Sequence, residues 1–164
     1  MGRFEPPDPL PELVSLTAPG GGSAPITIVA LAHSEKLLAP FLGWAAALAL
    51  EGELGKREHE ILALRTAHNC GSEFEWVEHA RIARTAGFTD EEIDRVAGGA
   101  DHGWSGAEKF LMLAADELHR DSSICHTTWS ELASHYSSAQ LVEAIFVVGQ
   151  YTMLSMVANI AEAE

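Results

Sequence analysis

Residues 56–87 read KREHEILALRTAHNCGSEFEWVEHARIARTAG, and their pattern is the clearest indication of the fold. Residues 56–69 are rich in strong helix formers and end at the break Asn69-Cys70-Gly71. Residues 72–86 carry apolar and small side chains at the spacing of one helix face, and Gly87 follows where a helix often ends. The sequence therefore predicts two helices that their short connection forces to pack as antiparallel neighbours.

Helical spacing continues on both sides of this pair, and no segment shows the clear alternation of a strand. Capping-box spacing, which marks a helix start, occurs in the pairs Thr89–Glu92, Ser105–Glu108 and Ser137–Gln140. The sequence therefore predicts an all-α bundle of about six to eight helices. The expected helices cover residues 26–33, 35–51, 56–69, 72–86, 89–96, 105–119, 127–135 and 137–162.

The first 25 residues differ from the rest of the chain. They contain prolines at positions 6, 7, 9 and 11 and a glycine run at positions 20–22, which oppose a regular helix. We expect residues 1–25 to form an extended arm over the body or over a neighbouring subunit. Residues 26–164 are expected to form a single all-helical domain, a usual size for one core.

Composition restricts the class of function. The chain of 164 residues carries a net charge of -14, which repels nucleic acids and anionic membrane surfaces. The apolar stretch Leu141–Ala161 contains Glu143, Gln150 and Asn159, which are costly in lipid, so we expect a buried or interface helix rather than a membrane span. Two distant cysteines make no disulfide framework, and residues 1–16 lack the apolar core of a signal peptide. The expected location is the cytoplasm.

Two polar residues, Glu75 and His79, lie in the stripe of helix 72–86 that should face the core. They are four residues apart and can touch, and a buried carboxylate beside a buried imidazole supplies an acid or base with a tuned pKa. Glu60 shares a face with small and apolar residues on the preceding helix, so antiparallel packing can bring it to the same place. These three are the candidate catalytic residues; the alternative is a structural pair that holds two helices in register.

Three further residues are candidates for substrate binding. Ser72 and Trp76 share the stripe of Glu75 and His79, although Trp76 also suits a core position. Arg65 on the preceding helix can offset the negative field for an anionic substrate, or else pair with Glu60.

The order of these residues resembles the central motif of the carboxymuconolactone decarboxylase family, whose superfamily includes the alkyl hydroperoxidase D-like enzymes. The motif comprises Glu60, Arg65, Ser72, Glu75, Trp76 and His79, followed by Ala83, Gly87 and Glu91-Glu92-Ile93. Segments 116–119, 128–129 and 149–151 are similar to the C-terminal part of longer members, so the resemblance covers about residues 30–159. It implies an alkyl hydroperoxidase D-like helical bundle and a homo-oligomer, a trimer or a hexamer.

One departure from the family pattern affects the expected chemistry. The hydroperoxidase branch has two cysteines where this chain has Ser72 and Glu75, whereas Glu60 and His79 match the family's glutamate and histidine. Peroxide reduction by a dithiol needs both thiols, and Cys70 lies outside their register. The resemblance therefore implies the decarboxylase branch, which acts without a metal or cofactor on a small unsaturated carboxylate or lactone. His79 would transfer the proton, Glu60 and Glu75 would orient it, and Tyr151 would reach the site from the final helix.

Other classes of function remain as alternatives. A zinc-protease motif would need a second histidine four residues after His59, but the next is His68, so no metal site is expected. A non-enzymatic oligomeric scaffold or small-molecule-binding protein would use the same helices with a purely structural Glu–His cluster. Peroxide reduction is the least favoured alternative.

Overall fold

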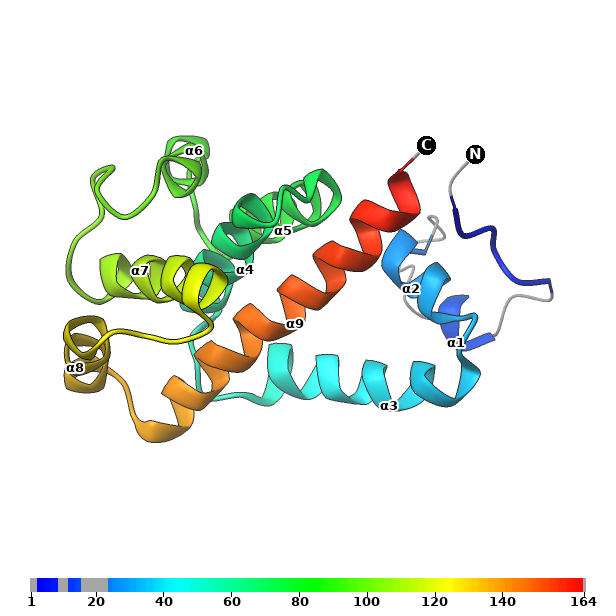
Figure 1. Ribbon diagram of the computed structural model, residues 1–164, viewed down its shortest axis with the longest axis horizontal. Helices are drawn as coiled ribbons and strands as arrows, with labels where there is room; N and C mark the ends of the chain where they lie inside the picture. Colours follow the sequence, from blue (N-terminus) through cyan, green and yellow to red (C-terminus); the bar gives the residue numbers. More distant parts are fainter. Residues whose placement is uncertain (1–2, 9–11, 16–23, 164) are drawn as a thin grey trace.

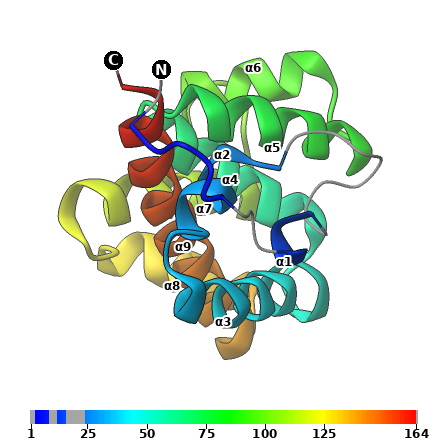
Figure 2. The same ribbon diagram turned by 90° about the vertical axis from the view of Figure 1, so that its right-hand side faces the viewer.

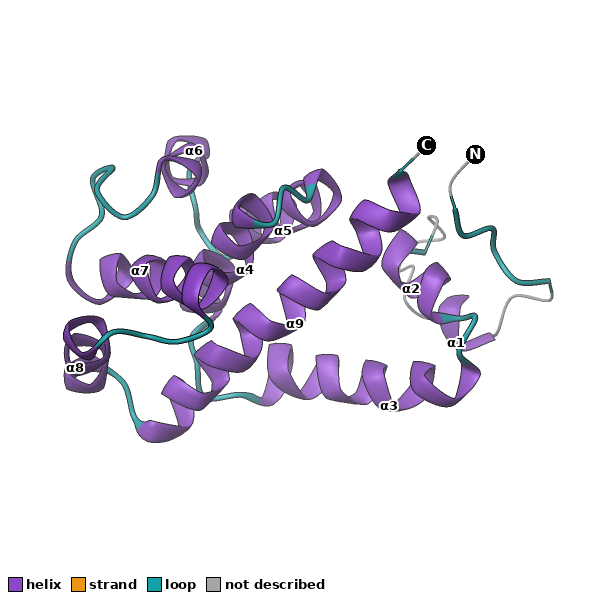
Figure 3. Cartoon of the chain, viewed as in Figure 1, coloured by secondary structure: helices purple, strands orange, loops and turns teal. Residues whose placement is uncertain are grey.

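The computed structural model describes residues 3–8, 12–15 and 24–163, and every regular element in these residues is helical (Figures 1 and 3). The all-α prediction is therefore confirmed. The elements are α1 (Glu12–Ser15), α2 (Ile26–Leu31), α3 (Glu35–Ala46), the π-helix η1 (Ala47–Glu51), α4 (Lys56–Asn69), α5 (Glu73–Thr85), α6 (Asp90–Gly98), α7 (Gly106–Asp121), α8 (His126–His135) and α9 (Ser138–Glu162).

Helix α4 forms the centre of the main core, because α5, α7 and α9 all pack against it. Its residues Ile61, Leu62 and Leu64 are completely buried. Burying a side chain of this size contributes about 1.5–3 kcal/mol. Because α4 is covered on several sides, even its polar residues His59 and Glu60 are buried. The helix that is most fully enclosed therefore also carries the ionisable groups of the site.

Helix α9 runs beside α4 over the length of the body (Figure 1). By length and composition it is the one helix in residues 3–8, 12–15 and 24–163 that could cross a membrane. However, 44% of its most apolar window is buried, where α9 packs on α2, α4, α5 and α7. Helix α9 is therefore a core helix, and part of its apolar surface also faces outward.

Local capping interactions explain several helix ends. The capping boxes Thr89–Glu92 and Ser137–Gln140 form as predicted. After α5, Gly87 has a φ of 92°, and the Phe88 N–H donates to the Ala83 carbonyl, which closes the helix with a Schellman-type turn.

The third predicted capping box does not form. Ser105 precedes α7 as expected, but its side chain makes no capping hydrogen bond. The Glu108 carboxylate instead accepts a hydrogen bond from Arg57 Nε at 2.6 Å, because α4 packs against α7 and offers a charged partner.

Helices α2, α3 and α9 form three sides of a triangle in Figure 1, and Figure 2 shows α3 at the opposite edge of the molecule from α6. Within α3 only Leu38 is buried, in a small cluster with Val14, Ile28 and Ala32. The predicted helix 35–51 is present but ends in the π-helical turn η1.

The N-terminal segment is described only in part. The Arg3 N–H donates to the Ala161 carbonyl at 3.3 Å, and His33 Nε2 lies 2.7 Å from the Glu5 carbonyl oxygen. Helix α1 is a single turn within the segment expected to be extended; it follows Pro11, and proline is tolerated where a helix begins. The glycine run at 20–22 and the prolines at 9 and 11 lie outside the described residues.

Candidate acid–base site

The centre of the site is a buried pair formed by Glu60 of α4 and His79 of α5. His79 Nδ1 lies 2.8 Å from Glu60 Oε2, and both side chains are only 7% exposed. With Glu60 ionised, Nδ1 carries the hydrogen and donates it to the carboxylate, which fixes the ring orientation and the tautomer. Nε2 is therefore left as the nitrogen that can accept or deliver a proton.

Glu75 lies one turn before His79 on α5. Its Oε2 is 3.7 Å from His79 Nε2, longer than a hydrogen bond. Burial raises the pKa of Glu75 above its ordinary value, and the nearby His79 offsets part of this effect. The Glu75 carboxyl therefore favours its protonated form more than an exposed carboxyl does. It lies close to His79 Nε2 and can supply a proton to that nitrogen.

A second pair, His59 of α4 and Tyr151 of α9, adjoins the first. The Tyr151 hydroxyl lies 3.0 Å from His59 Nε2, and the Tyr151 ring meets the His79 ring edge-on at 4.3 Å between centroids. Burial lowers the pKa of His59 and raises the pKa of Tyr151, so both groups favour their neutral forms. A neutral phenol and a neutral imidazole therefore share this hydrogen bond, and the tautomer of His59 decides which of them donates.

These groups meet a cavity of about 280 Å³ between α4, α5, α9 and the η1 turn. His59, Glu60, His79 and Tyr151 supply its polar wall, and the remaining wall is mostly apolar. Its lining is completed by Ala49, Leu50, Leu54, Lys56, Ile82, Thr85 and Ala86. The arrangement can hold a small, largely apolar molecule against an imidazole that is oriented for proton transfer.

The structure brings together the three candidate catalytic residues and Tyr151, but it places the other candidates elsewhere. Ser72 is the N-cap of α5, and its hydroxyl accepts from the Glu75 N–H at 3.4 Å. Trp76 packs on the main core, and its ring lies 6.0 Å from that of His68. Neither of these two side chains lines the cavity.

Arg65 does not pair with Glu60. Its Nε and Nη2 bind Asp116 of α7 at 2.5 and 3.1 Å, and Nη1 donates to the carbonyls of Val96 and Ala97. A guanidinium with this many partners is held as a structural tie between α4, α6 and α7, because each of its three nitrogens has an acceptor. Arg65 also lies outside the cavity lining.

His59 is a site residue that the sequence interpretation missed. It was considered only as the start of a zinc motif, although it directly precedes Glu60 and so lies on the neighbouring part of the same buried helix. No group of three or more His, Cys, Asp or Glu residues in the described part of the chain could hold a metal ion.

The two cysteines lie apart from the cavity. Cys70 Sγ is 3.8 Å from His119 Nδ1 at the end of α4, and burial raises the pKa of its thiol. Cys125 Sγ contacts Glu117 Oε1 at 3.3 Å, at the start of α8. Neither thiol lines the cavity with His79.

The protein is thus a helical bundle with a buried Glu–His pair at a small cavity. Residues 35–117 match the carboxymuconolactone decarboxylase family, which covers half of the chain. The chain belongs to this family, whose alkyl hydroperoxidase D-like fold it shares. A search of curated proteins found no match.

Several solved structures share this fold. One is an uncharacterized peroxidase-related protein from Silicibacter sp. TM1040, with a TM-score of 0.84 and 19% identity over 99% of this chain and 89% of that chain. Another is described as an alkylhydroperoxidase AhpD core, an uncharacterized peroxidase-related protein from Ralstonia eutropha JMP134, with a TM-score of 0.81 and 19% identity over 96% and 88%. A protein of unknown function from Agrobacterium tumefaciens has a TM-score of 0.72 and 15% identity over 82% and 93%. At these identities the likeness establishes the fold alone.

Proposed function

We propose that the protein is a carboxymuconolactone decarboxylase-like lyase that performs acid–base chemistry on a small unsaturated carboxylate or lactone. The observation that carries this proposal is the buried hydrogen bond between Glu60 and His79 at the wall of a mostly apolar cavity. An imidazole with a fixed tautomer, facing a cavity of small-molecule size, is the equipment that a proton-transfer step needs.

The proposed reaction uses His79 as the proton donor. The bond between the substrate and its carboxylate breaks, carbon dioxide leaves, and the electron pair is delocalised over the unsaturated system as a dienolate. His79 begins this step as the imidazolium, gives its Nε2 proton to the distal carbon and becomes the neutral imidazole with its hydrogen on Nδ1. The ring then recovers a proton from solvent, directly or through Glu75. The apolar wall favours loss of the carboxylate charge, and the His59–Tyr151 pair adds polar groups to this wall in their neutral forms.

The cysteine positions argue against peroxide reduction as the main activity. Ser72 and Glu75 stand where the hydroperoxidase branch has its thiols, and the Ser72 hydroxyl is already used as a helix cap. Cys70 has a raised pKa, which lowers the fraction of reactive thiolate. The similar solved structures described as peroxidase-related nevertheless make peroxide reduction an activity worth assaying.

We further propose that the protein works as a homo-oligomer. Helix α3 and the η1 turn have no charged residue between Leu37 and Leu50, yet Leu37 and Trp44 are 57% and 43% exposed. A helix that is apolar on most of its surface is normally buried, so a second copy is the occupant that best explains this face. Light scattering over a range of concentrations tests this; a monomer at every concentration contradicts it.

The enzyme proposal is tested with 4-carboxymuconolactone as substrate. The wild-type protein should consume it, and His79→Ala should lower kcat by about 10²–10⁴-fold. His135→Ala, which removes an exposed histidine from α8, is the matched control and should keep full activity. A fully active, folded His79→Ala variant would exclude the assignment. No turnover by the wild type would exclude this substrate and favour the binding or scaffold alternative.

A further inference from the structure

Lys56 lies at the start of α4 and lines the same cavity as His79. It precedes His59 and Glu60 by three and four residues, so all three share one face of the helix. His59 and Glu60 are buried, whereas Lys56 is exposed. Lys56 therefore lines the solvent-facing part of the cavity, one helical turn from the acid–base pair.

Lys56 differs from its basic neighbours because they already have partners. The other lysine and arginine residues of α4 and α5 form the pairs Arg57 with Glu92 and Glu108, Arg65 with Asp116, Arg81 with Glu78, and Arg84 with Asp90. Lys56 makes no hydrogen bond or ion pair with any of the described residues. It is also the one lysine or arginine in the lining of this cavity.

The negative electrostatic field of the chain makes an unpaired cation in the cavity important for binding an anion. The chain carries a net charge of -14, and Glu60 lies in the cavity wall. A carboxylate that enters the cavity is repelled unless a nearby cation offsets this field. The structure leaves Arg65, the cation that the sequence suggested for this purpose, bound to Asp116. Lys56 is the group that can take its place.

We propose that Lys56 binds a carboxylate of the substrate that remains intact in the reaction. This inference rests on the proposed function of the same cavity and adds the residue that holds the carboxylate retained by the substrate. An ion pair stabilises a carboxylate as the anion, so the carboxylate held by Lys56 is not the one lost. The departing carboxylate then lies nearer to His79, whose partner Glu60 is one helical turn from Lys56.

Binding of a product-like probe tests this without turnover. The probe is muconolactone, which has one carboxylate on an unsaturated lactone, and its methyl ester is the uncharged comparison. Calorimetric titration should show that Lys56→Met weakens binding of the acid by about ten-fold or more, because a charge-assisted hydrogen bond is lost. Lys56→Arg should retain most of the affinity, and the ester should bind the wild type and Lys56→Met equally.

Lys36→Met is the matched control, because it removes an exposed lysine from α3, outside the cavity lining. It should bind the acid as the wild type does, which excludes a general effect of net charge. Equal affinity of Lys56→Met and the wild type for the acid would overturn the proposal, as would a wild type that prefers the ester or binds neither compound. Failure of the decarboxylase assay alone would leave the Lys56 result intact, since binding is measured separately.

Discussion

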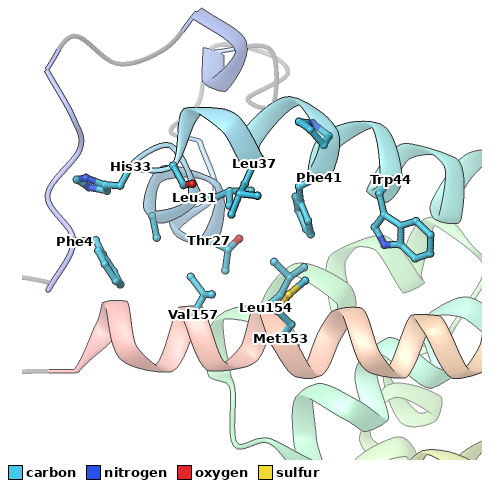
Figure 4. Close-up of a pocket in the computed structure, with 13 residues that line it drawn as sticks. Phe4, Thr27, Leu31, His33, Leu37, Phe41, Trp44, Met153, Leu154 and Val157 are labelled. Carbon is cyan, nitrogen blue, oxygen red and sulfur yellow. The ribbon is translucent and has the colours of Figure 1, made fainter.

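Two hollows lie on opposite sides of α9, and they differ in almost every property. The first is the cavity of about 280 Å³ to which α9 contributes Tyr151, and its other walls are the helices α4 and α5 and the η1 turn. The second is an apolar groove of about 580 Å³ between α2, α3 and α9, to which α9 contributes Met153, Leu154 and Val157 (Figure 4). The smaller hollow has an ionisable cluster, and the larger has an apolar lining.

The two hollows suit different tasks. The cavity is suited to positioning reactive groups, and the groove is suited to association with another protein surface. Proton transfer requires groups held to within a fraction of an ångström, and the enclosed α4–α5 pair provides that rigidity. The groove has the opposite character: Phe4, Leu37 and Trp44 on its rim are partly exposed, and Figure 4 shows no polar cluster at its centre. A large apolar surface of this kind is typical of an interface, so the comparison is consistent with our proposals of catalysis on one side of α9 and assembly on the other.

The largest expected effect on activity comes from a substitution in the cavity that contains His79. Glu60→Gln keeps the size of the side chain but offers His79 Nδ1 an amide in place of a carboxylate. The amide can donate to Nδ1, which moves the imidazole hydrogen to Nε2 and loses the ion-pair stabilisation of the protonated ring. We expect kcat to fall by about 10²–10⁴-fold.

Nitrogen NMR of His79 measures this tautomer change directly, and the activity assay measures its consequence. Glu131→Gln on α8 removes an exposed carboxylate and should alter neither property. A Glu60→Gln variant with full activity and an altered tautomer would show that Glu60 has only a structural function.

The next largest effect is expected on self-association through the apolar groove between α2, α3 and α9. Trp44 is 43% exposed and contacts Phe146 of α9 edge-on, with 5.3 Å between ring centroids. Trp44→Asp places a charge on this apolar face and should weaken self-association by about 30-fold or more, as expected for a central aromatic interface residue. Trp129→Asp makes the same change at a tryptophan on α8 that is 40% exposed. Sedimentation should show a smaller species for Trp44→Asp alone; equal behaviour of the two variants would contradict the assignment of this face.

Local and long-range features of this molecule were predictable to different extents. The bounds of α4 and the starts of α6 and α9 follow from propensity and capping pairs, which act over a few residues. The approach of Glu60 to His79 follows from two adjacent helices and a short connection. These features could therefore be derived from the sequence, and the fold prediction is confirmed.

Partners that lie far apart in the sequence were not predictable in the same way. His59 and Tyr151 are 92 residues apart, and Arg65 and Asp116 are 51 residues apart. Which carboxylate satisfies Arg65 depends on how α7 packs against α4, and no local pattern specifies it. For the same reason the sequence suggested Arg65, rather than Lys56, as the cation available to a substrate.

A smaller effect is expected on the dependence of stability on pH. Because burial raises the pKa of Glu75, the folded protein retains a proton there that the unfolded chain releases above the ordinary value of 4.5. This contribution to stability is fully present below that value and is lost as the pH rises through the raised pKa. Glu75→Gln stays neutral, so its Tm relative to wild type should increase between pH 4.5 and pH 8.

Scanning calorimetry at both pH values measures this difference, and 1 kcal/mol corresponds to about 2–4 °C in a domain of this size. The depressed pKa of His59 makes both proteins less stable at low pH, and it cancels in the comparison. Glu131→Gln should show no change in relative Tm with pH. A relative Tm for Glu75→Gln that is constant over the range would mean that Glu75 ionises normally.

The smallest expected effect, close to none, comes from Cys70→Ser. The thiol contacts His119 at the end of α4 rather than His79, and its raised pKa favours the unreactive form. If the cavity performs acid–base chemistry, kcat with 4-carboxymuconolactone should stay within about two-fold of wild type, as for other changes outside a site. Cys125→Ser is the matched control at an exposed thiol. A Cys70→Ser variant that loses activity while Cys125→Ser keeps it would move the chemistry from His79 to a thiol, and the contrast between the two sides of α9 would no longer hold.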